Sequence, residues 1–311
     1  MVTISRIKSI DELIHRLWNE TEYPIGVWMG RGAEALELSG GVEKTQLRNL
    51  LRGLSPDGRP TFAHSVDAPD VPPGLEIALN APKSVSALWA LASERQANEI
   101  QACAQGAAET ASVHAERALY WDATGLLGQR KAAVFAVIHE QVSQDQNPNL
   151  HSHVVACNFD GRMDEMNDGT IARVRHHVDF VYQRQLRHRL EQNLGIVTES
   201  EENGFRVRGM PRNISNLFSQ SGQLTLGLPH ELFQSWRDMA EKAGWGEKEA
   251  GKLLELRNEQ KQFTEKFDFK RRQAAVAHIL SRRFSQLDDS HDHDDVSPKS
   301  DSRTQSQGHT Y

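Results

Sequence analysis

The sequence has few cysteines and no long apolar run, and both gaps exclude whole classes of protein. Its two cysteines, Cys103 and Cys157, are far apart, so they suit neither a disulfide framework nor a thiolate metal site. No apolar run reaches the ~18 residues that a membrane-spanning helix needs. The N-terminal segment also lacks the apolar core of a secretory signal, so we expect a cytoplasmic protein with no membrane contact.

The chain also lacks the positive net charge that is typical of nucleic-acid-binding domains. Its formal net charge is −6. Residues 288–311 contain six Asp against Lys299 and Arg303, a net −4, which leaves −2 for the rest of the chain. A body this close to neutral can still gather basic side chains on one surface. The overall charge therefore does not exclude a nucleic-acid partner.

A length of 311 residues with 38% apolar and 25% charged residues is typical of a globular protein. It allows one large domain or two modest ones. From about Ser285 the sequence turns to Ser, Asp, His, Gln and Thr with almost no apolar residues, a composition that is typical of disorder. We therefore predict a folded domain over residues 1–285 and a disordered, acidic and polar tail over 286–311, in which the His-Asp-His-Asp run is solvated.

Alternating apolar and polar residues predict strands over 1–7 and 75–80, and the second of these carries Glu76 on its polar face. Two apolar runs, over 132–138 and 151–159, predict two more strands. The polar segment between these runs is short enough for an antiparallel hairpin. A further strand is expected over 203–209.

Apolar residues at spacings of three and four predict helices, the clearest over 171–194, where Gly195 is placed to end the helix. Asp11 is the expected cap of a helix over 12–19. The remaining helices are predicted over 43–52, 82–121 and 229–284, with loops or turns at 23–26, 55–58 and 59–73.

Three histidines near the predicted hairpin are the distinctive chemical feature of the sequence. His151 and His153 share a face if they lie on a strand, because side chains alternate with a period of two. His139 ends the preceding predicted strand, and a hairpin would bring it back beside them. Three imidazoles can then converge on a divalent metal ion and leave coordination positions open, which is the catalytic pattern. The alternative is two surface histidines on a strand and an unrelated third.

Three sequence blocks resemble those of the MobF-type conjugative relaxases, members of the HUH endonuclease superfamily. Residues 28–40, WMGRGAEALELSG, resemble the family's WxGxGAExLxLxG block, and residues 75–86, LEIALNAPKSVS, resemble LDLTFSAPKSVS. His139-Glu140 followed by residues 148–153, PNLHSH, resembles the HExS…DPQLHTH block. The blocks occur in the family's order and at similar separations. The resemblance covers about residues 1–220 well and 221–285 loosely.

The resemblance implies an α/β fold of the α+β type, with a central antiparallel sheet flanked by helices. It also implies a metal-dependent enzyme that nicks single-stranded DNA and transfers the cut strand. In such relaxases three histidines hold a divalent metal ion, here Mg²⁺, Mn²⁺ or a similar ion, on the scissile phosphate, and His139, His151 and His153 match them. An acidic residue on a neighbouring strand supports the site, and Glu76 stands where the family usually has Asp. A tyrosine attacks the phosphorus and forms a 5′-phosphotyrosyl intermediate.

The sequence departs from the family at this nucleophile. Counting back from Trp28, the usual tyrosine pair falls on Leu17-Trp18, and Tyr23 is the only tyrosine among the first 119 residues. Three alternatives stay open. Tyr23 has taken over the catalytic role from a shifted position, or the domain binds DNA without cutting it, or metal-bound water serves a simple nuclease.

Further features concern the hairpin and the DNA. The segment between His139 and His151 is one residue longer than is usual in the family. Lys83, near a helix start, is a candidate for a phosphate contact, as are basic residues of the predicted 171–194 helix: Arg173, Arg175, Arg184 and Arg187. The sequence has no GxxxxGK[ST] phosphate loop. The resemblance implies single-stranded or origin DNA and accessory conjugation proteins as partners, and the missing phosphate loop adds a separate helicase to them.

Overall fold

The computed structural model describes residues 1–18, 25–60, 72–120, 133–143, 145–158, 167–218 and 229–254. Residues 1–256 form one compact unit. Most of the predicted 59–73 loop, the end of the predicted domain and the whole predicted tail lie outside the described residues. No helix in the described part of the chain is long and apolar enough to cross a membrane.

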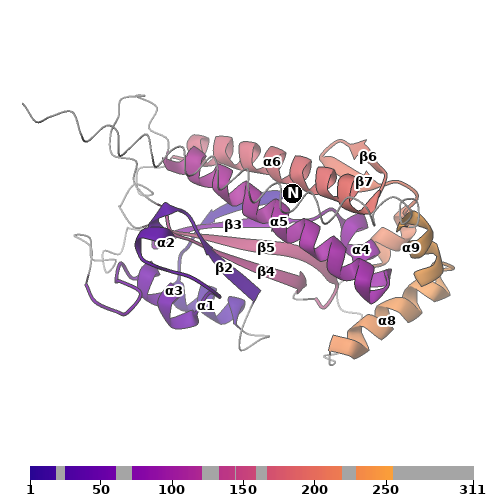
Figure 1. The fold of residues 1–311 in the computed structure, drawn as a ribbon, viewed down its shortest axis with the longest axis horizontal. Coiled ribbons are helices and arrows are strands. Elements are labelled where there is room, and N and C mark those ends of the chain that lie inside the picture. The colour runs from indigo at the N-terminus through magenta and orange to yellow at the C-terminus, as the bar shows by residue number, and fades with distance from the viewer. Residues whose placement is uncertain are drawn as a thin grey trace, which may run out of the picture. The chain divides into compact units, whose positions relative to one another are not determined.

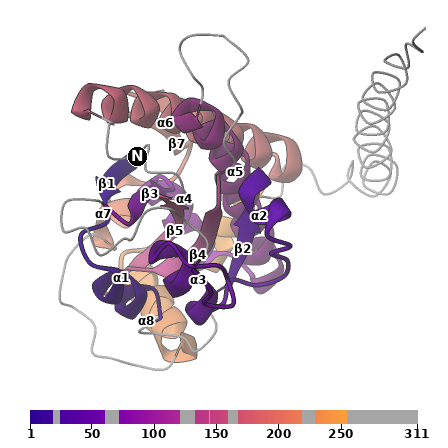
Figure 2. The same cartoon turned by 90° about the vertical axis from the view of Figure 1, so that its left-hand side faces the viewer.

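A five-stranded antiparallel sheet forms the centre of this unit, with the strand order β1-β3-β5-β4-β2 (Figures 1 and 2). The strands are β1 (Val2–Arg6), β2 (Ile25–Met29), β3 (Gly74–Asn80), β4 (Phe135–Val142) and β5 (Pro148–Cys157). The predicted strands at the N-terminus, around Glu76 and in the hairpin are therefore confirmed, as is the predicted fold class. The chain order differs from the spatial order, so β5 lies between β3 and β4 and both neighbours contribute side chains beside its own.

Residues 25 and 26 form part of β2, so their predicted place in a loop is wrong. Ile25 pairs with His139 and Gly26 with Ile138 at the edge of the sheet. A Cβ on Gly26 would lie 3.0 Å from the Val137 carbonyl oxygen, closer than side chains normally approach. Pairing with β4 thus overrides the local turn preference of Pro and Gly, and the missing side chain lets the strands come together.

The β4–β5 hairpin is longer than predicted, because both strands continue into the polar segment between the apolar runs. Glu140 pairs with His151 and Val142 pairs with Pro148. Between these two pairs β4 has one residue and β5 has two, so the ladder contains a β-bulge. The hairpin turn that remains closes with a hydrogen bond from the Ser143 amide to the Asn147 carbonyl oxygen, 3.0 Å.

Helices cover both faces of the sheet, as Figures 1 and 2 show. On one face, called here the α5–α6 face, lie α4 (Lys83–Leu91), α5 (Glu94–Tyr120) and α6 (Asp168–Leu194), packed on Phe135, Val137 and Val154. On the other, the α1–α3 face, lie α1 (Ile10–Leu17) and α3 (Lys44–Leu51), packed on Ala136, Ile138 and Val155. Side-chain alternation along β4 and β5 therefore supplies two separate hydrophobic cores.

Two helix starts differ from the sequence prediction. The N-cap of α1 is Ser9, whose Oγ accepts a hydrogen bond from the Glu12 amide at 3.2 Å, so the predicted cap Asp11 is wrong and lies in the first turn. The predicted helix over 82–121 is two helices. Between them Gln96 Oε1 accepts hydrogen bonds from the Ser93 amide, 3.4 Å, and hydroxyl, 2.8 Å, a side-chain arrangement that starts a new helix.

The long helix α6 and its end at Gly195 are confirmed. Asn167 caps its start, and Gly195 adopts a left-handed conformation with φ of 67°, which glycine allows at little cost. The predicted strand near 203–209 is β7, paired with a second short strand. The remaining elements are α2 (Arg31–Ala35), β6 (Thr198–Glu201), β7 (Gly204–Val207), α7 (Arg212–Leu217), α8 (Pro229–Lys242) and α9 (Glu247–Leu254).

Candidate metal centre

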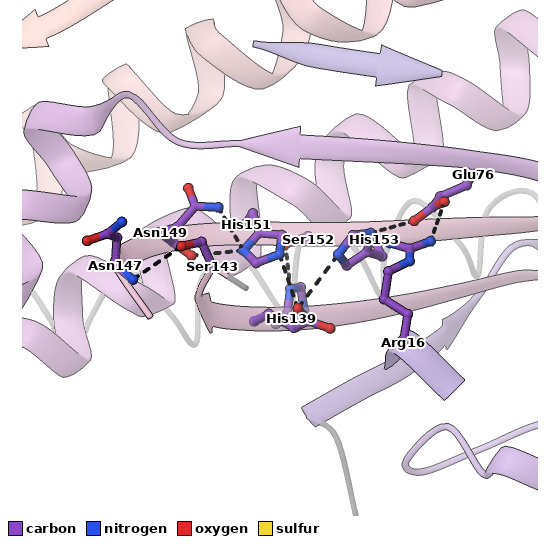
Figure 3. Close-up of polar contacts among 10 residues, drawn as sticks. Arg16, Glu76, His139, Ser143, Asn147, Asn149, His151, Ser152 and His153 are labelled. Carbon is purple, nitrogen blue, oxygen red and sulfur yellow. Dashed lines mark hydrogen bonds and ion pairs between the residues drawn. The ribbon is translucent and has the colours of Figure 1, made fainter. Parts of the chain in front are cut away.

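A cluster of ionisable side chains lies on the α1–α3 face, where β3, β5 and β4 run side by side. His151 and His153 come from β5, Glu76 from β3 and Glu140 from β4. Arg16 reaches the cluster from α1. Figure 3 shows Glu76 and Arg16 beside His153, with Asn149 beside His151 further along the strand. Alternation along β5 places both histidines on one face, as the sequence predicts.

Glu76 connects His153 to Arg16. One carboxylate oxygen lies 2.6 Å from Nδ1 of His153, and the other accepts a hydrogen bond from the Arg16 guanidinium at 2.7 Å. The side chains of Glu76 and His153 are 13% and 8% exposed. The Glu76 carboxylate therefore fixes the orientation of the His153 ring through Nδ1, and Nε2 of the ring stays available for another contact.

His151 is held in the same way by its own strand. Its Nδ1 lies 2.8 Å from the Asn149 carbonyl oxygen and 3.3 Å from the Asn149 side-chain nitrogen. Its Nε2 lies 3.1 Å from Oε2 of Glu140, and the same oxygen is 3.7 Å from Nε2 of His153. Both histidines thus use Nδ1 for a protein contact and turn Nε2 toward one carboxylate.

His139 is not brought into this cluster. It pairs with Ser152, its Nδ1 lies 2.8 Å from Ser152 Oγ, and its Nε2 lies 4.0 Å from a carboxylate oxygen of Glu109 on α5. Both contacts are on the α5–α6 face, on the opposite side of the sheet from His151 and His153. Nε2 of His139 is buried and has no hydrogen-bond partner within the described residues.

Hydrogen bonds within the cluster shift the pKa values of its two carboxylates and of its central histidine. Burial raises the pKa of Glu76 and of Glu140, but hydrogen bonds with the histidines, and for Glu76 also with Arg16, outweigh burial and lower each pKa to about 2. Burial lowers the pKa of His153, and hydrogen bonds with the two carboxylates outweigh it and raise that pKa. Burial alone lowers the pKa of His139 to about 4, so this ring is neutral at physiological pH.

The donor set fits a divalent metal ion. One ligand atom each from Glu140, His151 and His153 lies within 4.8 Å of the other two. Two imidazole nitrogens and one carboxylate are ligands that such ions accept, and three protein ligands leave coordination positions open for a substrate. The contacts of Glu76 and Asn149 on the Nδ1 atoms leave both Nε2 atoms available, which is the usual support for metal-binding histidines.

The other predicted site residues lie apart from the cluster or outside the described residues. Tyr23 falls in the second group. Lys83 begins α4, three residues after Asn80, which pairs with His151, so it lies at the same end of the sheet as the cluster. The four predicted arginines are on α6, which packs on the opposite face: Arg173, Arg175, Arg184 and Arg187.

Sequence reasoning did not identify Glu140 and Arg16. Glu140 directly follows His139, and neighbouring residues in an extended strand face opposite sides of the sheet. Only one of these two side chains can therefore lie on the same face as His151 and His153. Arg16 is 60 residues from Glu76, and its role depends on how α1 packs under the sheet. The one signal in the sequence is that Arg16 directly precedes Leu17-Trp18, the positions of the family's usual tyrosine pair.

These features define an α/β domain with a polar cluster on an antiparallel sheet, and comparison with known proteins specifies the class. The family description "TrwC relaxase" matches residues 8–293. The chain therefore belongs to the TrwC relaxase family, as its sequence blocks predict.

Curated relatives support this assignment. The chain is 30% identical over 219 residues to the multifunctional conjugation protein TraI of Escherichia coli, a match that covers 64% of this chain and 12% of TraI. TraI of E. coli strain K12 is 32% identical over 136 residues, covering 42% of this chain and 8% of that protein. The chain thus spans a small fraction of the length of these relatives.

Solved structures share the fold. The metal-bound complex of the conjugative relaxase TrwC with oriT DNA has a TM-score of 0.64 at 22% identity, covering 79% of this chain and 99% of that one. TrwC with a 27-mer DNA that comprises the recognition hairpin and the cleavage site has a TM-score of 0.58 at 21% identity, covering 79% and 99%. At this identity the likeness establishes the fold.

Proposed function

We propose that this protein is a metal-dependent relaxase, which nicks single-stranded DNA at an origin of transfer and transfers the strand through a phosphotyrosyl intermediate. The observation that supports this most strongly is the arrangement of His151, His153 and Glu140. Their free ligand atoms meet on one face of the sheet, while contacts on Nδ1 hold both rings. Membership of the TrwC relaxase family supplies the reaction class.

The residues of this chain perform the binding and positioning. Glu140, His151 and His153 would hold a divalent ion, which we propose to be Mg²⁺ or Mn²⁺ and which would neutralise charge on a phosphate when bound. Glu76 accepts hydrogen bonds from Arg16 and His153 and thereby keeps the His153 ring in one orientation. Lys83, at the same end of the sheet, is placed to contact a phosphate of the DNA strand. The α6 arginines would contact DNA only where it passes to the other face.

Tyr23 is the proposed nucleophile. The usual tyrosine positions carry Leu17, which is buried in the α1–α3 core, and Trp18, and neither has a hydroxyl. Tyr182 is fully buried on α6, so it cannot reach DNA. Burial also raises its pKa above the ordinary value, which disfavours the phenolate. Tyr23 lies a few residues beyond α1, the helix that carries Arg16 to the cluster.

A second candidate is a metal-dependent nuclease that uses water. The specific observation that favours it is the apolar side chain of Leu17 at the expected nucleophile position. The metal cluster and the DNA contacts would serve such an enzyme equally well. A DNA-binding protein without cleavage would keep the DNA contacts but would not need the cluster.

We propose further that origin DNA, accessory conjugation proteins and a separate helicase are its partners and that it acts in the cytoplasm, where its DNA is found. The family match to residue 293 supports a relaxase domain that extends through the predicted limit of 285.

The test is incubation of the full chain with Mn²⁺ and end-labelled single-stranded DNA from the origin region, read on a denaturing gel. We expect a cut strand and a covalent protein–DNA adduct that EDTA and Tyr23→Phe both abolish. Cleavage without an adduct, unchanged in Tyr23→Phe, would establish the water-dependent nuclease instead. Salt-sensitive binding without a cut under any divalent ion would establish a binding protein.

A further inference from the structure

The side of α6 that is turned away from the sheet carries cations around an exposed aromatic ring. The buried residues of the helix, from Val174 to Leu194, recur at spacings of three and four and pack on the core of the α5–α6 face. The same period places Arg173, Phe180 and Arg184 together on the opposite side of α6, where all three are exposed. Phe180 is 63% exposed, more than any other large apolar side chain in the described part of the chain.

The positive charge on this side is not neutralised by the acidic residues of α6. Each of the three acidic side chains of the helix forms an ion pair with another cation: Asp168 with Arg6, Asp179 with the N-terminal ammonium, and Glu191 with Arg187. Arg173 donates a hydrogen bond to the Thr170 hydroxyl at 3.2 Å. Among the described residues, no carboxylate pairs with Arg173 or Arg184. Both guanidinium groups are therefore available to an anionic ligand.

The neighbouring helix α5 extends this surface. Helices α5 and α6 lie side by side (Figures 1 and 2), and the ring centroids of His114 on α5 and His177 on α6 are 5.5 Å apart. Burial lowers the pKa of His114, and the positive charges of His177 and Arg117 lower it further. Six side chains form this surface, called here the outer patch: His114, Arg117, Arg173, His177, Phe180 and Arg184.

The chemistry of the outer patch fits a single-stranded nucleic acid. Arginines bind the phosphates of such a strand, and an exposed ring offers a face on which an unpaired base can stack. The bases of a duplex already stack on one another, so a duplex would leave Phe180 without a contact. Arg173 and Arg184 are separated by ~16 Å along the helix, at ~1.5 Å per residue, with Phe180 between them. A strand of a few nucleotides can therefore meet both arginines and the ring.

We propose that the outer patch is a second binding site for single-stranded DNA, separate from the metal cluster. Its side chains point away from the sheet, and α6 itself lies between them and the core of the α5–α6 face. The nucleotides bound at the patch are therefore not those held at the cluster. The inference rests on the proposed function, because an enzyme that cuts one strand and transfers it must handle a second strand, which the patch would hold.

Native mass spectrometry of the full, metal-free chain counts the strands that it binds. The probe is oligothymidine of ~6 nucleotides, within the length that one single-strand site covers. We expect two strands per wild-type chain, with the weaker binding step reduced by ~5-fold or more in Phe180→Ala, the low end of the loss of one base stack. One strand per wild-type chain, or a Phe180→Ala variant that binds two strands with unchanged affinity, would overturn the proposal.

Matched variants separate the patch from general effects of charge. Phe180→Tyr keeps an aromatic ring and should bind two strands as wild type does. The double variant Arg173→Ala with Arg184→Ala should lose the second strand, whereas Arg95→Ala, on α5 and paired with Glu99, should keep it. Circular dichroism checks that the variants fold. Equal losses in Arg95→Ala and in the double variant would contradict a defined site.

Photocrosslinking to an oligonucleotide that contains 5-iodouracil locates the second strand. We expect a crosslinked peptide that includes Phe180, and no crosslink on α6 would overturn the proposal. Poly-glutamate that displaces this strand as effectively as oligothymidine would assign the patch to an acidic protein instead. A chain that binds two strands but cuts no DNA would refute the proposed function and leave the second site standing. A chain that cuts DNA but binds one strand would do the reverse.

Discussion

Replacing Glu76 by Gln should destabilise the metal-free protein in a way that depends on pH. Glu76 is 13% exposed, accepts hydrogen bonds from Arg16 and His153, and has a pKa lowered from 4.5 to about 2. Its folded pKa is below the unfolded value, so its ionised form stabilises the native state. That contribution is fully present above pH 4.5 and is lost as the pH falls from 4.5 toward 2.

The size of this effect follows from the pKa difference. One pKa unit corresponds to ~1.4 kcal/mol, so a shift from 4.5 to about 2 is worth about 3 kcal/mol at pH 7. At pH 3 the carboxyl is mostly protonated in the unfolded chain but still mostly ionised in the folded protein, so about 1 kcal/mol of the contribution remains. The stability difference between wild type and Glu76→Gln should therefore shrink by about 2 kcal/mol between pH 7 and pH 3.

Urea denaturation of the metal-free protein at these two pH values measures the effect. Comparison across pH cancels any cost of the substitution that does not depend on ionisation. Glu202→Gln, in the exposed turn between β6 and β7, is the matched control and should change the free energy of unfolding by less than ~0.5 kcal/mol. A Glu76→Gln difference that is the same at pH 7 and pH 3 would refute the reasoning.

Four further results are expected. Leu186→Ala, which truncates a fully buried side chain of α6, should lower the free energy of unfolding in urea by ~2–5 kcal/mol, and a loss under ~1 kcal/mol would contradict its core position. Gly195→Ala should cost ~1 kcal/mol in thermal unfolding, because φ is 67° at this helix end; no change would refute the strain. The folded pKa of His139, about 4, is below the unfolded value near 6.5, so wild type should lose about 3 kcal/mol between pH 6.5 and pH 4 and His139→Gln should lose less; parallel curves would count against it. Lys83→Ala, close to the end of β3 that pairs with His151, should weaken single-stranded DNA binding and flatten its salt dependence by about one ion, and Arg184→Ala, in the middle of α6, should do so less; the opposite order would move the DNA to α6.

Most of the sheet and the long helices could be predicted because their signals are local. The alternation around Glu76 and the apolar runs of the hairpin predict β3, β4 and β5, and the spacing of apolar residues with Gly195 at the end predicts α6. Strand β2 could not be predicted, because Ile25 and Gly26 become extended only by pairing with β4. Ser93 divides one predicted helix into two through a side-chain contact with Gln96, which helix propensity does not reveal.

The candidate site could be predicted only in part. A strand period of two placed His151 and His153 together, and the sequence resemblance indicated Glu76. The third position could not be inferred, because β4 is buried on both faces and its apolar run shows no alternation that tells which side His139 faces. The bulge and the pairing partner decide it. Arg16 joins Glu76 through the packing of a separate helix, which no local pattern encodes.

Cleavage of DNA by the metal cluster is the central claim, and one measurement tests it most directly. Wild type and His151→Ala are incubated with Mn²⁺ and a single-stranded library that contains every six-base sequence, and the cut products are sequenced. We predict cleavage at a defined sequence by wild type and its loss in His151→Ala, which removes a ligand while the neighbouring strands keep the fold. Cleavage that His151→Ala leaves intact, or no cleavage of any sequence in the library, would contradict the account.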